Sequence, residues 1–205
     1  MLRLYDYLPS GNGYKVRLLL AQLGTPFELV QRDIAQGETR TPEFLAKNPN
    51  GRIPLLEIEP GKFLAESNAI LFYLSEGTRF FPDDRFERAQ VLQWMCFEQY
   101  SHEPNIATVR FWVHYTELTP ERRAAIEQKR PLGYAALDVM ERHLTERTFF
   151  VGERYSIADI ALYAYTHVAD EGGFELGRFP AVQDWLGRVR AEPRHVPITA
   201  GEAGR

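Results

Sequence analysis

The sequence is poor in cysteine, has no long apolar run and carries no excess of basic charge. Cys96 is its one cysteine, so no disulfide can form within the chain. No stretch reaches the 18 or more apolar residues of a membrane-spanning helix, and we expect no membrane partner. The formal net charge of −4 argues against a nucleic-acid partner, because proteins that bind nucleic acids present a basic face.

The start of the chain and its composition suit a globular protein. Met1 leads directly into a strand-like segment, so we expect no signal peptide and a cytoplasmic location. The 205 residues fit one large domain or two small ones. The apolar fraction of 44% and the charged fraction of 25% lie near globular averages, so the chain can bury a packed core.

The first third of the chain alternates between strand and helix patterns. In chain order we expect a strand at 2–6, a helix at 16–23, a strand at 27–30, a short helix from 41, strands at 55–58 and 62–65, and a helix at 67–76. Gly24 is expected to end the first helix, while Thr41 caps the short one with Pro42 at its first position. The order βαβαββα begins with a βαβ unit, which implies parallel strands.

Only helical periodicity follows residue 85. We expect a linker at 77–85 and then helices at 86–115, 120–147, 156–169 and 180–190. Pro104 and Pro131 are expected to interrupt the first two of these helices. The predicted fold class is therefore α/β plus all-α, with an N-terminal domain at 1–77 and an all-helical domain at 85–200.

Pro54 stands immediately before a predicted strand, where a proline cannot donate a ladder hydrogen bond. A trans proline at the start of the strand is one interpretation. A cis Ile53–Pro54 bond that makes a tight turn is the other. Composition alone favours the trans proline.

Two helix starts carry polar residues that suit either structure or binding. Ser67 is predicted as an N-cap, but the free N–H groups of such a helix start also bind a carboxylate, and the neighbouring Glu66 suits an ammonium. The segment Ser10-Gly11-Asn12-Gly13 reads as a turn in which the glycines permit positive φ and Asn12 is a candidate cap of the following helix. Both interpretations stay open on the residues alone.

The pattern Asn-x-x-Gly-x-x-Pro at 48–54, followed by Glu-Ser-x-Ala-Ile at 66–70, resembles the N-terminal domain of the glutathione transferase superfamily. The resemblance spans nearly the whole chain. It implies a thioredoxin-like N-terminal domain, an all-helical C-terminal domain and glutathione as cosubstrate. It also implies a cis Pro54, with the backbone of Ile53 paired to the cysteinyl backbone of glutathione. The expected glutathione-binding residues are Arg52, Ile53, Pro54, Glu66, Ser67 and Asn68.

Within this resemblance the loop at 10–13 is the expected thiol-activating site. Ser10 resembles the activating hydroxyl residue of the theta and nu classes, and residues 12–16 look most like a nu-type Asn-Gly-x-Lys-Val. A hydroxyl aimed at the glutathione sulfur stabilises the thiolate, which is the nucleophile. We rank Ser10 first, Asn12 second and Tyr7 third, with Tyr5 as a further rival. The loop has no cysteine, which disfavours thiol exchange by the protein itself.

The helical half carries a Ser-x-x-Asp capping box at 156–159, which supports the fold. Arg110, Phe111 and Tyr115 crowd the end of the helix that the resemblance places at the substrate pocket, although aromatic stripes are as often core. Arg110 is a candidate for a polar or anionic second substrate. Cys96 is expected to be a buried small hydrophobe.

The resemblance implies an enzyme that uses glutathione in conjugation, peroxide reduction or small-molecule disulfide exchange, with a small hydrophobic or electrophilic second substrate. It also implies a homodimer, and no metal is expected. One rival is a non-catalytic scaffold or regulatory binding protein of the same fold. Another is a maleylacetoacetate-isomerase-like enzyme, but its Ser-Ser-Cys-type loop is missing here. Ser10, Pro54, Glu66 and Ser67 together favour the transferase.

Overall fold

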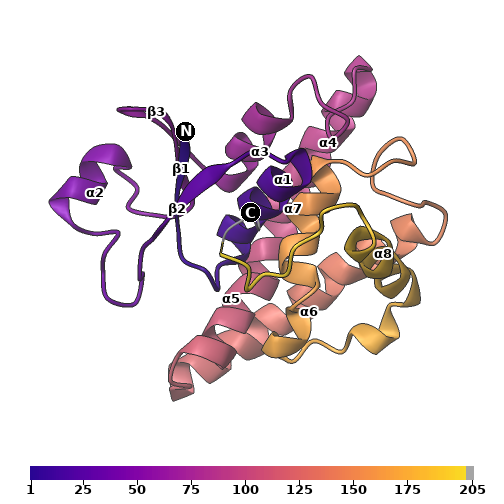
Figure 1. Cartoon of the computed structure of the whole chain (residues 1–205). Helices are drawn as coiled ribbons and strands as arrows, with labels where there is room; N and C mark the ends of the chain where they lie inside the picture. The colour runs from indigo at the N-terminus through magenta and orange to yellow at the C-terminus, as the bar shows by residue number, and fades with distance from the viewer. Residues whose placement is uncertain (202–205) are drawn as a thin grey trace. The chain divides into compact units, whose positions relative to one another are not determined.

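The computed structural model describes residues 1–201, which divide into two compact units (Figure 1). Unit 1 combines residues 1–76 with the tail from residue 193, and unit 2 comprises residues 77–192. We had expected residues 85–200 to form the helical domain. The tail instead belongs to unit 1, because side chains of that unit bind its backbone carbonyls, as described below.

Unit 1 is built on a four-stranded mixed sheet. Its strands are β1 (Leu2–Asp6), β2 (Phe27–Gln31), β3 (Leu55–Glu59) and β4 (Lys62–Ala65), in the spatial order β2-β1-β3-β4. β1 pairs with β2 in parallel, while the β1–β3 and β3–β4 pairs are antiparallel. With its three helices, the unit has the expected βαβαββα order and is thioredoxin-like.

The two faces of this sheet bury different helices. α1 (Gly11–Leu23) and α3 (Ser67–Ser75) cover one face, and α2 (Pro42–Lys47) lies on the other (Figure 1). The α1 side packs the main core around Leu4, Val16, Leu20, Phe27, Leu56 and Ile70. The α2 side holds a smaller cluster of Tyr5, Phe44 and Leu55. Because α1 and α3 cover the same face of the sheet, the chain enters both helices on that side of unit 1.

α1 begins earlier than its apolar residues predict. The expected start was Val16, but the helix begins at Gly11, so Asn12 and Gly13 belong to its first turn. Neither Gly11 nor Gly13 is among the glycines with positive φ, so this segment does not use the freedom that its glycines permit. The helix ends as predicted at Gly24, whose φ of 67° places it in the left-handed region.

Unit 2 is helical among its described residues. Its helices are α4 (Arg85–Phe97), a π-helical turn (Glu98–His102), α5 (Glu103–Tyr115), α6 (Pro120–Leu144), α7 (Ile157–Thr166), two short 3-10 turns (Ala169–Gly172 and Leu176–Arg178) and α8 (Pro180–Arg190). The expected capping box at the start of α7 is present, with Ser156 and Asp159 bonded reciprocally. The most hydrophobic helix, α7, is buried along its whole length.

The two prolines act differently from their prediction as interruptions. The expected helix at 86–115 divides into α4 and α5 at the π-helical turn, and Pro104 occupies the first turn of α5, where its missing N–H costs little. Pro131 lies inside α6 without ending it. Pro131 is exposed, and on the solvent side of a helix the backbone carbonyls can tilt outward to water, so the helix continues past the proline.

Cys96 is exposed on α4, which corrects the expectation that it is buried. The core face of α4 is formed by Val91, Trp94 and Met95. Each residue turns the helix by about 100°, so the position after Met95 points away from the core. Leu92, one turn before Cys96, is exposed as well.

Candidate functional site

The turn between β1 and α1 is held by Ser10. Its Oγ accepts a hydrogen bond from the Gly13 N–H at 3.4 Å, so Ser10 and not Asn12 is the N-cap of α1. The Ser10 N–H donates to the Tyr7 carbonyl at 2.7 Å, which closes the turn. A hydroxyl that accepts a capping bond keeps its own proton to donate. Ser10 is partly exposed, so this proton is able to reach a ligand.

Asn12 and Ser67 meet although 55 residues separate them. The Ser67 hydroxyl donates to Asn12 Oδ1 at 3.0 Å, and the Lys15 ammonium donates to the same oxygen at 2.8 Å. Lys15 also lies 3.5 Å from Ser67 Oγ and is fully buried. The first turns of α1 and α3 are therefore joined by a polar cluster of three side chains. Lys15 stands within the motif at residues 12–16, but nothing in the local sequence predicts this position for its side chain.

The start of α3 differs from the predicted N-cap. Glu66 occupies the N-cap position without a side-chain capping bond, and Ser67 is the first helical residue. Glu66 has φ of 69° and ψ of 114°, an unfavourable conformation for a residue with a Cβ. Residues held in such conformations cluster at active sites and ligand-binding segments. This conformation leaves Glu66 exposed, buries Ser67 and places the partly exposed Asn68 in the first turn.

The turn before β3 contains a cis Ile53–Pro54 peptide bond, so the trans interpretation was wrong. Asn48 organises this turn: its Nδ2 donates to the Arg52 carbonyl at 2.8 Å, and its Oδ1 accepts from the Asn50 N–H at 3.1 Å. Pro54 is buried, Ile53 is partly exposed and Arg52 is exposed. The turn thus presents Ile53 just before the start of β3, and the side chain of Asn48 fixes the backbone that leads to it.

The rival tyrosines occupy different surroundings. Tyr5 is 2% exposed, lies among Phe44 and Phe63 on the α2 side of the sheet, and donates from its hydroxyl to Glu57 at 3.0 Å. Burial raises the pKa of Tyr5, which disfavours a tyrosinate there. Tyr7 is partly exposed and follows β1 directly, beside Ser10. Of the two, Tyr7 lies in the β1–α1 turn.

A buried ion pair supports the β1–α1 turn from beneath. Asp6 Oδ2 and Arg17 Nε are 2.9 Å apart, and Asp6 Oδ1 accepts the Tyr7 N–H at 2.7 Å. Burial raises the pKa of Asp6 to about 6 although Arg17 opposes the shift. Gly13 allows the close approach, since a Cβ there would lie 1.6 Å from Asp6 Oδ1. This pair was not predicted from the sequence, although the charge of Arg17 inside the apolar run at 16–20 is a sign of it.

The candidate pocket residues of α5 form a cluster of their own. The Arg110 guanidinium binds Glu171 Oε2 at 2.7 Å and the Tyr115 hydroxyl at 2.9 Å. The rings of Phe111 and Tyr115 stack with centroids 6.1 Å apart, and Phe111 is 39% exposed. Arg110 is thus held by residues of its own unit, while Phe111 presents an apolar ring to solvent.

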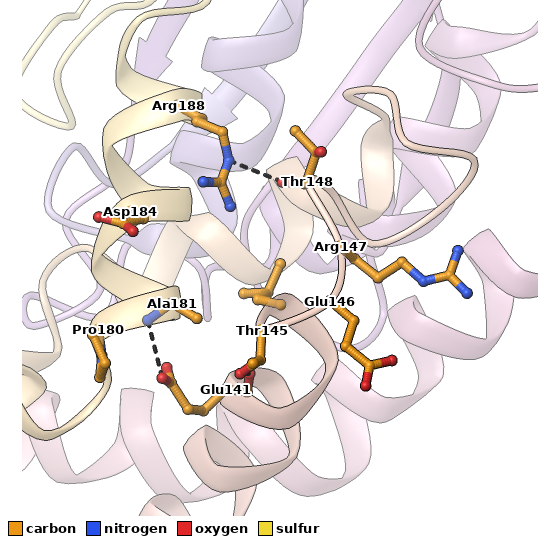
Figure 2. Close-up of a pocket in the computed structure, with 10 residues that line it drawn as sticks. Glu141, Thr145, Glu146, Arg147, Thr148, Pro180, Ala181, Asp184 and Arg188 are labelled. Carbon is orange, nitrogen blue, oxygen red and sulfur yellow. Dashed lines mark hydrogen bonds between the residues drawn. The ribbon is translucent and has the colours of Figure 1, made fainter.

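A separate open cavity of about 460 Å³ lies in unit 2 (Figure 2). Glu141 receives the backbone N–H groups of Ala181 and Val182 there, so it already caps α8. Arg188 binds the carbonyl of Thr148 at 3.0 Å (Figure 2). None of the residues predicted to bind a ligand lines this cavity.

Across residues 1–201, no three or more His, Cys, Asp or Glu side chains are grouped to hold a metal ion. Within the same range, every helix is too short or too polar to cross a membrane.

Comparisons with known proteins assign both units to the same family. Residues 1–76 match the family model for the glutathione S-transferase N-terminal domain, and residues 93–193 match that for the C-terminal domain. The chain is similar to the disulfide-bond oxidoreductase YfcG of Escherichia coli strain K12, with 31% identity over 201 residues that cover 94% of this chain and 92% of YfcG.

Two solved structures are similar along nearly the whole chain. A glutathione S-transferase from Pseudomonas fluorescens Pf-5 is 55% identical with a TM-score of 0.95, and the match covers 97% of this chain and 99% of that one. A glutathione transferase from Burkholderia graminis, crystallised with two glutathione molecules per subunit, is 30% identical with a TM-score of 0.82, covering 94% and 85%.

Proposed function

The chain belongs to the glutathione S-transferase family, and on this premise we propose that it binds glutathione and activates the glutathione thiol as a nucleophile. The observation that carries the proposal is the hydrogen bond from Ser67 to Asn12, which joins the first turns of α3 and α1. The start of α3 suits a carboxylate, and the start of α1 suits a thiolate. A small peptide with both groups fits such a junction.

The carboxylate end of glutathione binds at α3. The N–H groups of its first turn, at Ser67 and Asn68, receive the γ-glutamyl carboxylate, and the helix dipole favours that charge. The exposed Glu66 carboxylate pairs with the ammonium of the same residue. The strained backbone of Glu66 supports this assignment, because it turns that side chain outward at the helix start.

The cysteinyl backbone of glutathione pairs with Ile53. The cis Pro54 turn presents Ile53 beside β3, so its N–H and C=O receive the peptide as an added strand would. Arg52 is the exposed neighbour and contacts the peptide from the side. This mode of binding recognises backbone and leaves the cysteinyl side chain directed to the β1–α1 turn.

The thiol is activated by hydrogen bonds at that turn. The Ser10 hydroxyl donates first, the Asn12 amide adds a second donor and Tyr7 is the third candidate. Donors to the sulfur favour the thiolate and lower its pKa from a free value near ~8.5. A hydrogen bond to a charged group contributes roughly 1.5–3 kcal/mol, which corresponds to about one to two pKa units.

The chemistry that follows is thiolate attack on a small molecule, and we favour disulfide or peroxide substrates over conjugation. In disulfide exchange, the glutathione thiolate attacks one sulfur, forms a mixed disulfide and releases the other sulfur as a thiolate. A second glutathione thiolate then attacks the mixed disulfide, yielding glutathione disulfide and the second released thiolate. The relative named as a disulfide-bond oxidoreductase and the neighbour with two bound glutathione molecules support this course.

The second substrate meets α5. Phe111 and Tyr115 offer stacked apolar rings, which suit a small hydrophobic or electrophilic molecule. Arg110 orients Tyr115 through the hydrogen bond to its hydroxyl. Because Arg110 is also paired with Glu171, an anionic substrate must compete with that carboxylate for the guanidinium.

The deciding experiment is an ultraviolet titration of the thiol of bound glutathione. Ser10→Gly removes the hydroxyl while retaining most of the helix cap, since glycine costs only a few tenths of a kcal/mol at that position. Ser10→Thr keeps both and is the control. We expect a depressed thiol pKa in the wild type and the Thr variant, and a rise of about one unit in the Gly variant.

Other results redirect the assignment. A depressed pKa that does not respond to Ser10→Gly transfers activation to Asn12 or Tyr7. Failure to bind immobilised glutathione, or binding with an unshifted thiol pKa, favours the alternative of a non-catalytic scaffold or regulatory binding protein.

We also propose that the protein is a cytoplasmic homodimer, with unit 1 of one subunit against the helices of the other. Phe86, Leu92 and Tyr100 are exposed apolar residues on α4 and the following turn, and such surfaces mark interaction sites. Sedimentation velocity tests the idea. Tyr100→Lys is expected to shift the dimer towards monomer, whereas Leu132→Lys, at an exposed position of α6, is expected to leave it intact. A monomeric wild type contradicts the proposal.

A further inference from the structure

Lys15 is a charged side chain in an unusual place. It is fully buried, and its Nζ reaches back by one helical turn to Asn12 Oδ1 at 2.8 Å. Burial of an ammonium is unfavourable unless it is well hydrogen-bonded. The start of a helix is also the end where the helix dipole disfavours a cation. Such an arrangement costs stability, and the contacts of Lys15 with Asn12 and Ser67 offer a functional reason for its position.

The Lys15 ammonium determines which way the Asn12 carboxamide faces. Asn12 Oδ1 accepts two donors, Lys15 Nζ at 2.8 Å and Ser67 Oγ at 3.0 Å. Exchanging the amide oxygen and nitrogen would set the NH₂ group against an ammonium, which has only donors. The oxygen therefore faces Lys15, and the amide nitrogen lies on the other side of Cγ.

We propose that Lys15 is a positioning residue for thiol activation: it holds the Asn12 carboxamide so that Nδ2 donates to the sulfur of bound glutathione. This inference rests on the proposed glutathione-binding function. Lys15 itself does not touch glutathione, and its effect reaches the sulfur through Asn12. An Asn12 side chain without this anchor can rotate, and rotation presents its oxygen, an acceptor, to the thiolate.

Binding of glutathione makes Lys15 more important. The Ser67 hydroxyl has one proton, and it donates this proton to Asn12 Oδ1. When the proton turns to a bound γ-glutamyl carboxylate, the Ser67 bond to Asn12 is lost while the Lys15 bond can remain. Lys15→Met should therefore raise the thiol pKa of saturated enzyme more than Ser67→Ala does, although Ser67→Ala should weaken binding more.

The test measures the thiol pKa of bound glutathione at saturating ligand, together with the Kd. Lys15→Met removes the ammonium at nearly constant volume and should raise the thiol pKa by about one unit. Lys15→Gln keeps an N–H donor on a side chain one atom shorter and should give an intermediate value. Lys62→Met changes an exposed lysine of β4 and should leave the pKa unchanged.

A double-mutant cycle with Asn12→Ala separates positioning from a direct effect of charge. If Lys15 acts through Asn12, adding Lys15→Met to Asn12→Ala should produce no further rise. Should Lys15→Met fail to fold, as judged by circular dichroism, the same cycle is run with Lys15→Gln, whose smaller rise must also vanish in the Asn12→Ala background.

The possible failures are distinguishable. A depressed wild-type thiol pKa that is unaffected by Lys15→Met overturns the inference and leaves the proposed function standing. A rise of equal size with and without Asn12 overturns positioning as well, because Lys15 would then act directly. An undepressed thiol pKa in the wild type refutes the proposed function and this inference with it.

Discussion

Asp6 and Arg17 form an ion pair that is almost fully withdrawn from water, with Oδ2 and Nε 2.9 Å apart and side-chain exposures of 0% and 1%. The remaining Arg17 donors bind backbone carbonyls of Leu8 at 2.7 Å, Ile198 at 2.8 Å and Ala200 at 2.6 Å. One guanidinium thus links the end of β1, the β1–α1 turn and the C-terminal tail. The turn that carries Ser10 is held in place by a residue outside the proposed binding site.

Arg17→Lys is expected to destabilise the protein by about 2–4 kcal/mol, because it leaves some of the buried acceptors of the guanidinium without a donor. A lysine keeps the charge but cannot serve four acceptors in the fork geometry of arginine. Chemical denaturation measures the loss, and limited proteolysis should cut the tail sooner. Arg3→Lys, at a 41% exposed side chain, is the control and should destabilise the protein far less, because exposed ion pairs contribute little to stability. Equal stability of both variants contradicts the argument.

The raised pKa of Asp6 predicts a pH dependence of stability. Burial raises this pKa to about 6, above the unfolded value of about 3.9. Between these values the folded state binds more protons than the unfolded state, so the contribution of Asp6 to stability falls as pH rises from about 4 to about 6. Asp159, whose pKa burial also raises to about 6, acts in the same window.

Asp6→Asn isolates the contribution of Asp6 from that of Asp159. We expect the difference in unfolding free energy between wild type and Asp6→Asn to change between pH 4 and pH 6 and to level off above pH 6. Denaturant titrations across this range provide the measurement. A difference that stays constant with pH would show that Asp6 is ionised throughout.

Gly13→Ala is expected to destabilise the fold strongly. Alanine is favoured over glycine by about 1 kcal/mol within a helix, but the added Cβ would lie 1.6 Å from Asp6 Oδ1. The carboxylate is fixed by Arg17, so it cannot move aside cheaply. Gly187→Ala, in α8, meets nothing within 4 Å and should instead raise the melting temperature. If both variants melt above the wild type, Asp6 is more mobile than its contacts indicate.

Sequence patterns predict the fold well here because most elements follow apolar periodicity. The strands and the helix-ending Gly24 are found where these patterns place them. The start of α1 was missed because its first turn is polar and glycine-rich, so the capping bond of Ser10, not an apolar residue, sets the boundary. Periodicity reports where a helix is buried, so a polar first turn falls outside that pattern.

The candidate site was harder to predict because its supporting residues are charged and buried. Charged residues are expected to be exposed to solvent. Asp6, Lys15 and Arg17, however, are only 0%, 0% and 1% exposed. Ser67 was predicted as an N-cap, but the unusual backbone of Glu66 moves the helix start by one residue and turns the Ser67 hydroxyl to Asn12. A long-range contact of this kind has no local signal in the sequence.

Asp159 provides the last prediction, in unit 2. Its Oδ1 accepts from the Phe150 N–H at 3.2 Å and from the Trp185 indole at 3.0 Å, while its Oδ2 accepts from the N–H and hydroxyl of Ser156 at 2.9 and 3.1 Å. Asp159→Asn places an NH₂ group against one pair of donors whichever way the amide turns. Burying such unmatched donors costs about 1–3 kcal/mol for each group, so we expect a loss of roughly 3 kcal/mol or more.

Thermal and denaturant unfolding measure this loss, with the exposed Asp184→Asn on α8 as the control. The control should stay within about 0.5 kcal/mol of the wild type. Asp159→Ala distinguishes the mechanism: it removes the acceptors without adding donors, so the comparison of the two variants measures the penalty of the misplaced NH₂ group. If Asp159→Asn is as stable as the wild type, the pair of donors that faces the NH₂ group must be satisfied by other acceptors or by water, and the hydrogen bond between Asp159 and Trp185 is not what anchors α7 to α8.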